Sequence, residues 1–452
     1  MRIAELTGQR VAIWGFGREG RAAIRALRRR LPEVVLALYC NESEVVEATA
    51  LDPALRVFAH EPDAVALSAY DVVVKSPGIS AYKPAILTAQ AQGTRFTSGT
   101  ALWFAENPHA RVIAVTGTKG KSTTTALLAH LARALRVRTA LAGNIGLPLL
   151  ELLDQDAELW AIELSSFQTG EAGALDLGVI TSLYEEHLDW HGSRERYVAD
   201  KLKLAEAAGQ LLVNAEQAVL LEKTSAHPHR QLFGNAEGWH VAEGFIHRAE
   251  NNVFALDALS VPGLHNALNA CAALAALELM GFDALGAAPA LARFRALPHR
   301  LQPLGERGGL QWVNDSISTT PLATLAALDS LHGREVTVIV GGHDRGLDWS
   351  PFVQSVAART ALRIVTQGAN GPRIAAALRA AKSSAPLGDV DKLDDAIEMA
   401  RTITPPGGTV LLSPGAPSFD QFHDYAERGR HFADIAGFEG NAITGIDGLG
   451  IA

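Results

Sequence analysis

The chain has 452 residues, 48% of them hydrophobic and 20% charged, with a formal net charge of −9. This length exceeds a single hydrophobic core, so we expect two or three domains, and the negative charge argues against a non-specific nucleic-acid or anionic-membrane surface. Two distant cysteines, no visible signal peptide and no apolar run of transmembrane length predict a cytoplasmic protein.

Residues 9–27 (QRVAIWGFGREGRAAIRAL) predict a strand, a turn and a helix, with Gly15, Gly17 and Gly20 in G-x-G-x-x-G spacing. Such a turn lets ligand phosphates approach the backbone, in NAD or in other ligands. A dinucleotide site also needs an acidic residue about twenty positions later, at the end of the next strand. That strand ends at Asn41 instead. A nicotinamide-dependent oxidoreductase is therefore disfavoured and stays an alternative.

A further strand in YDVVVKSPGI (70–79) ends in the turn Ser76-Pro77-Gly78. Strands and helices alternate up to this point, which is typical of a parallel sheet with helices on its faces. We therefore predict a Rossmann-like domain over residues 1–95.

Residues 111–125 (RVIAVTGTKGKSTTT) predict a buried strand, a glycine turn and the start of a helix. Gly117 and Gly120 would let the backbone wrap a polyphosphate, with Lys121 reaching the outer phosphates and Ser122 binding Mg²⁺. The usual spacing of such loops places a glycine at the position of Val115, so this loop is a shortened version. We predict that it binds ATP. A non-catalytic P-loop regulator or motor is an alternative.

Polar side chains follow the next strands. LWAIELSSFQ (159–168) ends an apolar run in Glu163, the place of a metal-proximal carboxylate in P-loop enzymes. GVITSLYEEHLDWH places His187 just beyond another buried strand, where open α/β sheets have the rim of their site. Lys201 lies in the amphipathic stretch RERYVADKLKLAEAA, and the pattern alone indicates a solvated charge.

The last part of the chain begins with a helix that carries Asn266 and Asn269 on one face, where amides could read an adenine edge or cap the helix. LPHRLQ (297–302) predicts an interdomain hinge with Arg300. Beyond it, LQWVNDS, VTVIVGG, LRIVTQG and TVLLSPG predict a second doubly wound sheet.

Together, TGTKGKST, GNIG, ELSSFQ, EEHLDWH, DKLKL, GLHNALNA, LPHR, NDS and SPGAPSFDQF resemble the Mur ligase family of peptidoglycan synthesis, over residues 8–436. LPHR and the SP…S-DQF motif resemble its glutamate-adding branch. Folylpolyglutamate synthase shares the central loop but lacks a first domain of this kind. The resemblance implies an α/β fold of three domains: a UDP-substrate domain (1–95), a P-loop ATPase domain (96–296), and a Rossmann-like domain (297–452) that closes over ATP and glutamate.

The resemblance also implies the reaction and its cofactors. ATP and Mg²⁺ would activate the carboxylate of UDP-N-acetylmuramoyl-L-alanine as an acyl phosphate, which the glutamate amine attacks. It implies small-molecule partners, no nucleic acid or membrane, and a monomer. Its catalytic residues would be Lys121, Asn144, His187 and Lys201. The metal ligands would be Ser122, Glu163, His187 and Lys201, the lysine as a carbamate.

The resemblance assigns the other contacts by motif. ATP would contact Gly117, Thr118, Lys119, Gly120, Lys121, Ser122, Thr123, Asn266, Asn269, Arg300 and Asp315. The UDP-substrate would contact Gly15, Phe16, Gly17, Arg18, Asn41, Ser76, Pro77, Gly78, Asn144 and Ser165. Glutamate would contact Thr319, Arg345, Ser418, Phe419 and Tyr425.

One departure concerns the enantiomer of glutamate. Members that add D-glutamate carry N-D-S-K-A-T where this chain has N-D-S-I-S-T, so Ile317 replaces a lysine that helps hold a carboxylate. Leaving the glutamate carboxylate in the same place without this buried charge partner would cost about 3–5 kcal/mol. We therefore infer that the carboxylate binds at a different position in this chain. Arg345 can still bind a carboxylate bidentately. We therefore predict L-glutamate, with D-glutamate as the alternative.

Overall fold

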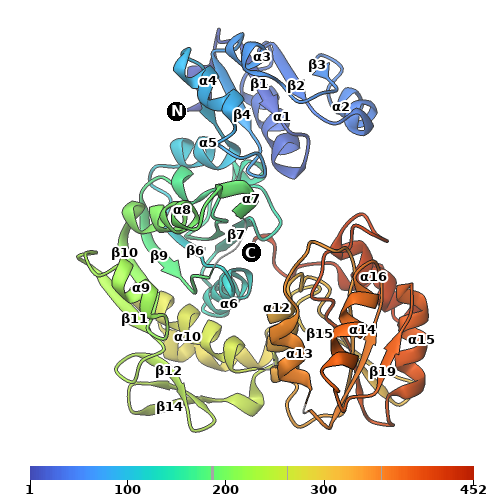
Figure 1. The fold of residues 1–452 in the computed structure, drawn as a ribbon. Coiled ribbons are helices and arrows are strands. Elements are labelled where there is room, and N and C mark those ends of the chain that lie inside the picture. The colour runs from blue at the N-terminus through green and yellow to red at the C-terminus, as the bar shows by residue number, and fades with distance from the viewer. Residues whose placement is uncertain (185–187, 262, 358) are drawn as a thin grey trace. The chain divides into compact units, whose positions relative to one another are not determined.

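The computed structural model describes residues 1–184, 188–261, 263–357 and 359–452. The chain forms two compact units (Figure 1). The first comprises Met1–Ala258, His265–Ala292 and Gly448–Ala452, and the second comprises Leu259–Leu264 and Arg293–Asp447. No helix in the described residues is long and apolar enough to cross a membrane.

The first unit begins with a five-stranded parallel sheet in the order β3-β2-β1-β4-β5. Its strands are β1 (Val11–Trp14), β2 (Leu36–Tyr39), β3 (Arg56–Phe58), β4 (Val72–Lys75) and β5 (Arg95–Thr97). Alternate side chains of β1 point to opposite faces. They pack with α1 (Arg18–Arg30) on one face, and with α3 (Ala64–Ser68) and α4 (Pro84–Ala91) on the other. This is the predicted Rossmann-like layer, and the turns after β1 and β4 lie at one edge of it.

A second sheet of the first unit has the order β11-β10-β9-β6-β8-β7-β21 and is parallel except for β21. Its strands are β6 (Val112–Thr116), β7 (Thr139–Gly143), β8 (Leu159–Glu163), β9 (Leu175–Ile180), β10 (Ala208–Asn214), β11 (Arg230–Phe233) and β21 (Gly450–Ile451). Its helices include α5 (Gly99–Glu106), α6 (Lys121–Ala134), α8 (Arg194–Ala207) and α10 (Leu264–Leu279). Strand β6 is central, so the loop that follows it is flanked by neighbouring strand ends.

Two features of the first unit differ from the sequence prediction. An antiparallel sheet of β12 (Trp239–Ala242), β13 (Phe245–Arg248) and β14 (Asn251–Ala255) was not foreseen. The predicted third domain (297–452) also included the C-terminal tail, whereas the tail forms β21, which pairs with β7 in the first unit. The tail covers an edge strand whose backbone groups would otherwise lack partners. The remainder of the three-domain division stays a prediction.

The second unit is built on a six-stranded sheet in the order β15-β16-β20-β17-β18-β19, with β15 antiparallel to β16. Its strands are β15 (Gln302–Arg307), β16 (Leu310–Asn314), β17 (Val336–Val340), β18 (Leu362–Thr366), β19 (Leu387–Asp389) and β20 (Thr409–Leu412). One face packs with α12 (Pro321–Ser330), α13 (Ser350–Val356) and α14 (Gly371–Ala380), and the other with α15 (Leu393–Ile403) and α16 (Tyr425–Ala436). The four predicted strands and the doubly wound α/β class are confirmed.

Candidate functional site

The predicted phosphate loop joins β6 to the N-terminus of α6, where the first backbone N–H groups of a helix have no partner within the helix. Gly117 and Gly120 have φ values of +153° and +85°, which L side chains rarely adopt. A Cβ on Gly120 would lie 2.5 Å from Asn269 Oδ1 of α10. Asn269 in turn accepts from the Thr124 hydroxyl (3.3 Å) and donates to Asn266 Oδ1 (3.4 Å). The predicted adenine-reading face of α10 thus lies against the phosphate loop.

The end of β9 fixes the shape of this loop. Thr118 N donates to Ser182 O (2.9 Å), Lys119 N donates to Ser182 Oγ (2.8 Å), and the Thr181 hydroxyl donates to Lys119 O (2.6 Å). Lys121 Nζ donates to Thr118 O at 3.0 Å, so the lysine folds back over the loop. Ser122 is buried and Thr123 is half-buried, both in the first turn of α6.

Lys201 lies beside the loop, whereas an amphipathic pattern alone would place it in solvent. Its side chain is 2% exposed, and its Nζ donates to Gly117 O at 3.0 Å. The ammonium also lies 5.1 Å from the centre of the Tyr197 ring, and the Tyr197 hydroxyl lies 2.7 Å from Thr118 Oγ1. Residues four apart share one face of a helix, so the spacing of Tyr197 and Lys201 in α8 could have revealed this pair.

Glu163, at the end of β8, is 1% exposed. Its Oε1 accepts from Asn144 Nδ2 at 2.8 Å, while its Oε2 is buried and has no hydrogen-bond partner among the described residues. A buried carboxylate oxygen without a donor is costly, and a divalent cation would satisfy it. His187 lies outside the described residues. Within the described part of the chain no three His, Cys, Asp or Glu side chains gather to hold a metal. The predicted metal ligands that the structure does describe are Ser122, Glu163 and Lys201.

The two turns predicted to hold UDP meet at one edge of the first sheet. A Cβ on Gly15 would lie 2.6 Å from Ser76 Oγ, and Ser76 N donates to Trp14 O at 2.9 Å. Phe16 is buried in the core with the Arg21 guanidinium 4.5 Å from its ring centre. Only the backbone of Phe16 can therefore face a ligand.

The remaining residues predicted to contact the UDP-substrate lie around these turns. Arg18 donates from Nη1 to Gly146 O (3.1 Å), and Asn41 is exposed after β2. The Ser165 hydroxyl donates to Gln168 Oε1 (2.8 Å) and is buried, which leaves it little access to a ligand. Gly17 caps α1, and in the turn after β4 Pro77 is half-buried and Gly78 is exposed.

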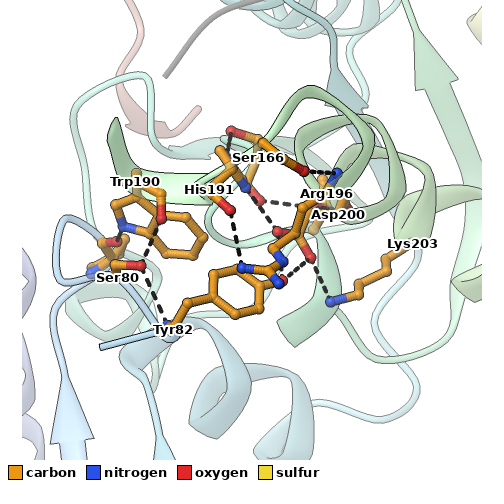
Figure 2. Close-up of polar contacts among 11 residues, drawn as sticks. Ser80, Tyr82, Ser166, Trp190, His191, Arg196, Asp200 and Lys203 are labelled. Carbon is orange, nitrogen blue, oxygen red and sulfur yellow. Dashed lines mark hydrogen bonds and ion pairs between the residues drawn. The ribbon is translucent and has the colours of Figure 1, made fainter. Parts of the chain in front are cut away.

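A hydrogen-bond network that the sequence did not reveal lies beside these residues (Figure 2). Ser166 Oγ lies 3.0 Å from His191 Nε2, and His191 Nδ1 lies 2.7 Å from Asp200 Oδ2. Burial acts to raise the pKa of Asp200, but hydrogen bonds from Lys203, Tyr82 and His191 outweigh it, and the pKa lies below its usual value. Asp200 therefore stays ionised, at the centre of the network.

In the second unit, the loops after three neighbouring strands are joined by backbone hydrogen bonds. Gly415 N donates to Ser318 O (2.9 Å), and His343 N donates to Pro417 O (2.9 Å). The Arg345 guanidinium lies 6.0 Å from the centre of the Phe419 ring. The residues predicted to bind glutamate follow these strands or begin α16, and are Thr319, Arg345, Ser418, Phe419 and Tyr425.

Arg428 of α16, which belongs to no motif predicted from the sequence, joins two of these loops. It is 1% exposed and donates to Ser316 O (2.8 Å), Ser316 Oγ (3.0 Å) and Ala416 O (3.0 Å). Burial lowers the pKa of its guanidinium to about 9. Its position one turn after Tyr425 is the only sequence signal that could have found it.

Asp315 is buried and holds the turn after β16. It accepts from Leu301 N (3.0 Å), Ser318 Oγ (2.6 Å) and Ser413 Oγ (2.8 Å), while burial raises its pKa to about 6. The exposed Arg300 lies two residues away from Gln302, at the start of β15. The predicted contacts of Asp315 and Arg300 with ATP stay predictions.

The chain matches two families of domains. Residues 115–277 match the Mur ligase middle domain, and residues 299–415 match the Mur ligase glutamate ligase domain. Several proteins named UDP-N-acetylmuramoyl-L-alanine–L-glutamate ligase are similar along the chain. Those of Xanthomonas euvesicatoria and Xylella fastidiosa are 51% and 50% identical, covering 100% of both chains. That of a Micromonospora strain is 38% identical, covering 96% of this chain and 98% of its own.

Solved structures of more distant proteins share the fold. UDP-N-acetylmuramate–alanine ligase of Thermotoga maritima superposes with a TM-score of 0.61 at 20% identity, covering 94% of this chain and 98% of its own. MurF ligase of Thermotoga maritima, solved with ADP, superposes with a TM-score of 0.58 at 16% identity, covering 96% and 95%. At these identities the likeness concerns the fold alone.

Proposed function

The chain belongs to the Mur ligase family, and we propose that it joins L-glutamate to UDP-N-acetylmuramoyl-L-alanine with hydrolysis of ATP to ADP and phosphate. Members of the family are ATP-dependent ligases of peptidoglycan precursor synthesis. The oxidoreductase and the P-loop regulator considered from the sequence have no support in these similarities. The observation that carries the proposal is the identity of about half of all residues, over the full chain, with ligases named for this reaction.

In the proposed reaction the γ-phosphoryl group of ATP passes to the alanine carboxylate. The glutamate amine then attacks the acyl phosphate, an amide forms, and inorganic phosphate leaves with the electron pair of the broken C–O bond. Such transfers depend on placement and on neutralising charge. Lys121 lies over the loop and can follow the migrating negative charge. Asn144 can orient the acceptor through its side-chain amide, and a hydrogen bond to Glu163 holds that amide in place.

Mg²⁺ would neutralise phosphate oxygens in this site. The Oε2 of Glu163, which lacks a hydrogen-bond partner in the described part of the chain, and the hydroxyl of Ser122 are oxygen ligands of the type that Mg²⁺ prefers. Lys201 would join them as a carbamate, because an ammonium would repel the cation. These residues fit the ion, and His187 completes the set inferred from the family.

The choice of L-glutamate rests on two features. The relatives that align over the full chain are named for L-glutamate. The position at which D-glutamate-adding members carry a lysine is the half-buried Ile317, so a carboxylate there would have no cation from this turn. The exposed Arg345, beside Phe419, offers a guanidinium for a carboxylate placed differently.

Product formation with each enantiomer tests the proposal. Purified protein is incubated with Mg-ATP, UDP-N-acetylmuramoyl-L-alanine and either L- or D-glutamate, and phosphate release is measured alongside mass spectrometry of the amide. We expect kcat/KM to be at least tenfold higher with L-glutamate. A preference for D-glutamate would refute the enantiomer, and no amide with either would refute the glutamate ligase. Phosphate release that needs neither acceptor would point to the regulator instead.

A further inference from the structure

One set of contacts between the layers of the two large sheets of the first unit involves residues 77–82 after β4, while α1 makes others, such as those of Arg18 with Gly146 O and of Arg25 with Glu151. Trp190 Nε1 donates to Pro77 O (3.1 Å), and the Ser80 hydroxyl donates to Trp190 O (2.6 Å). The Tyr82 hydroxyl reaches Asp200 Oδ1 and Oδ2 at 2.7 and 2.8 Å (Figure 2). This segment includes Pro77 and Gly78 of the turn predicted to hold UDP and the four residues after it, so the contacts act where a ligand would be held.

The same contacts lead to the phosphate loop. Asp200 is followed in α8 by Lys201, whose Nζ donates to Gly117 O at 3.0 Å. Asp200 itself is held from the other side by His191 Nδ1 (2.7 Å), and its backbone carbonyl accepts from the Thr169 hydroxyl (2.6 Å). Two hydrogen bonds, Tyr82 to Asp200 and Lys201 to Gly117, therefore join the segment after β4 to the phosphate loop, linked by the peptide bond between Asp200 and Lys201.

Aromatic packing stiffens this connection. The ring of Tyr82 meets Trp190 edge-on with centroids 5.7 Å apart, and the Arg196 guanidinium lies 4.4 Å from the centre of the Tyr82 ring. Trp190 also stacks on Phe167, with centroids 4.5 Å apart. The Tyr82 side chain, held by these ring contacts and by its hydroxyl on Asp200, has little freedom to change the distance that it spans.

We propose that Tyr82 and Ser80 are positioning residues for ligation, which set the distance between the UDP turn and the phosphate loop through Trp190 and Asp200. The inference rests on the proposed function, because it concerns an acceptor that must reach from one sheet to the other. UDP would be bound at one end of the acceptor and the reacting carboxylate would lie at its other end. A displacement of about 1 Å at the reacting atoms can cost about a hundredfold in rate.

Tyr82→Phe tests the proposal, because it removes only the hydroxyl. Loosening this connection lets the reacting atoms shift apart, so kcat is expected to fall by about tenfold or more. The dissociation constants of UDP-N-acetylmuramoyl-L-alanine and of Mg-ADP, measured by calorimetry, should stay within twofold, because neither ligand would contact the hydroxyl. Tyr70→Phe is the matched control: its hydroxyl lies in the loop before β4, 3.3 Å from the hydroxyl of Tyr39 in β2, and kcat should be unchanged.

Ser80→Ala provides an independent variant on the same segment, and it should lower kcat in the same way if Tyr82→Phe fails to fold. Unchanged kcat in a folded Tyr82 or Ser80 variant would overturn the proposal. A matching rise in the dissociation constant of the UDP-substrate would also overturn it, because the residue would then bind the substrate directly. Wild-type protein that forms no amide would refute the proposed function instead, so the two failures are distinguishable.

Discussion

Substitution of Gly120 tests the assigned phosphate loop directly. Gly244 serves as its control, because alanine there would meet the same backbone strain without a clash of the side chain. Gly120 and Gly244 have φ values of +85° and +80°, and a Cβ on Gly244 would meet nothing within 4 Å. Alanine at either position must adopt a left-handed backbone conformation, which destabilises the fold by about 1–2 kcal/mol. At Gly120 the new Cβ would also lie 2.5 Å from Asn269 Oδ1, so that side chain must move.

Moving Asn269 weakens its hydrogen bonds with Thr124 and Asn266, each contributing about 1 kcal/mol. Gly120→Ala should therefore destabilise the first unit by about 2–4 kcal/mol, and Gly244→Ala by about 1–2 kcal/mol. Each kcal/mol of destabilisation lowers the Tm of a unit of this size by about 2–4 °C. The expected losses in Tm are therefore about 4–16 °C for Gly120→Ala and about 2–8 °C for Gly244→Ala.

Nucleotide binding separates the two variants further. Mg-ADP should bind Gly120→Ala at least tenfold more weakly, which removes about 1.4 kcal/mol of ligand-induced stabilisation at saturation. It should bind Gly244→Ala as it binds the wild type, since Gly244 lies in the hairpin between β12 and β13. Calorimetric titration and thermal unfolding with and without Mg-ADP measure both effects. Equal losses in Tm together with unchanged ADP affinity in Gly120→Ala would refute the assigned loop.

Two further predictions concern buried charges. We expect Lys201 to carry a carbamate, so ¹³C-bicarbonate should give a carbamate NMR signal that is absent from Lys201→Arg; active wild-type enzyme without that signal would contradict the assignment. Burial raises the folded pKa of Asp315 to about 6, above the value near 3.8 of an exposed aspartate, so its contribution to stability is complete below pH 4 and is lost as pH rises through 6. A shift of about two pKa units corresponds to about 3 kcal/mol, so Asp315→Asn should flatten the fall in second-unit stability between pH 4 and 6, and an unchanged profile would refute this role.

The sequence determined the local elements and the chemistry of the phosphate loop. Apolar runs such as Val112–Val115 predicted buried strands, and the glycines around Lys121 predicted a turn before a helix, because backbone preferences and hydrophobic periodicity act over a few residues. The motif order along the chain also indicated the Mur ligase family, and the matches to its domains confirmed it. L-glutamate, the metal ligands and the ATP contacts of the second unit stay predictions.

The tertiary structure alone decided which distant side chains meet. Lys201 follows a surface-like pattern, yet packing of α8 against the loop buries it beside Gly117. Tyr82 and Asp200 lie 118 residues apart and form one hydrogen-bonded pair, while the tail pairs as β21 with β7. Such contacts depend on how whole elements pack, and burial then changes the charge balance of groups such as Asp315, whose sequence neighbours give no sign of it. The local sequence pattern does not determine these distances, because each distance depends on many packing contacts between elements far apart in the chain.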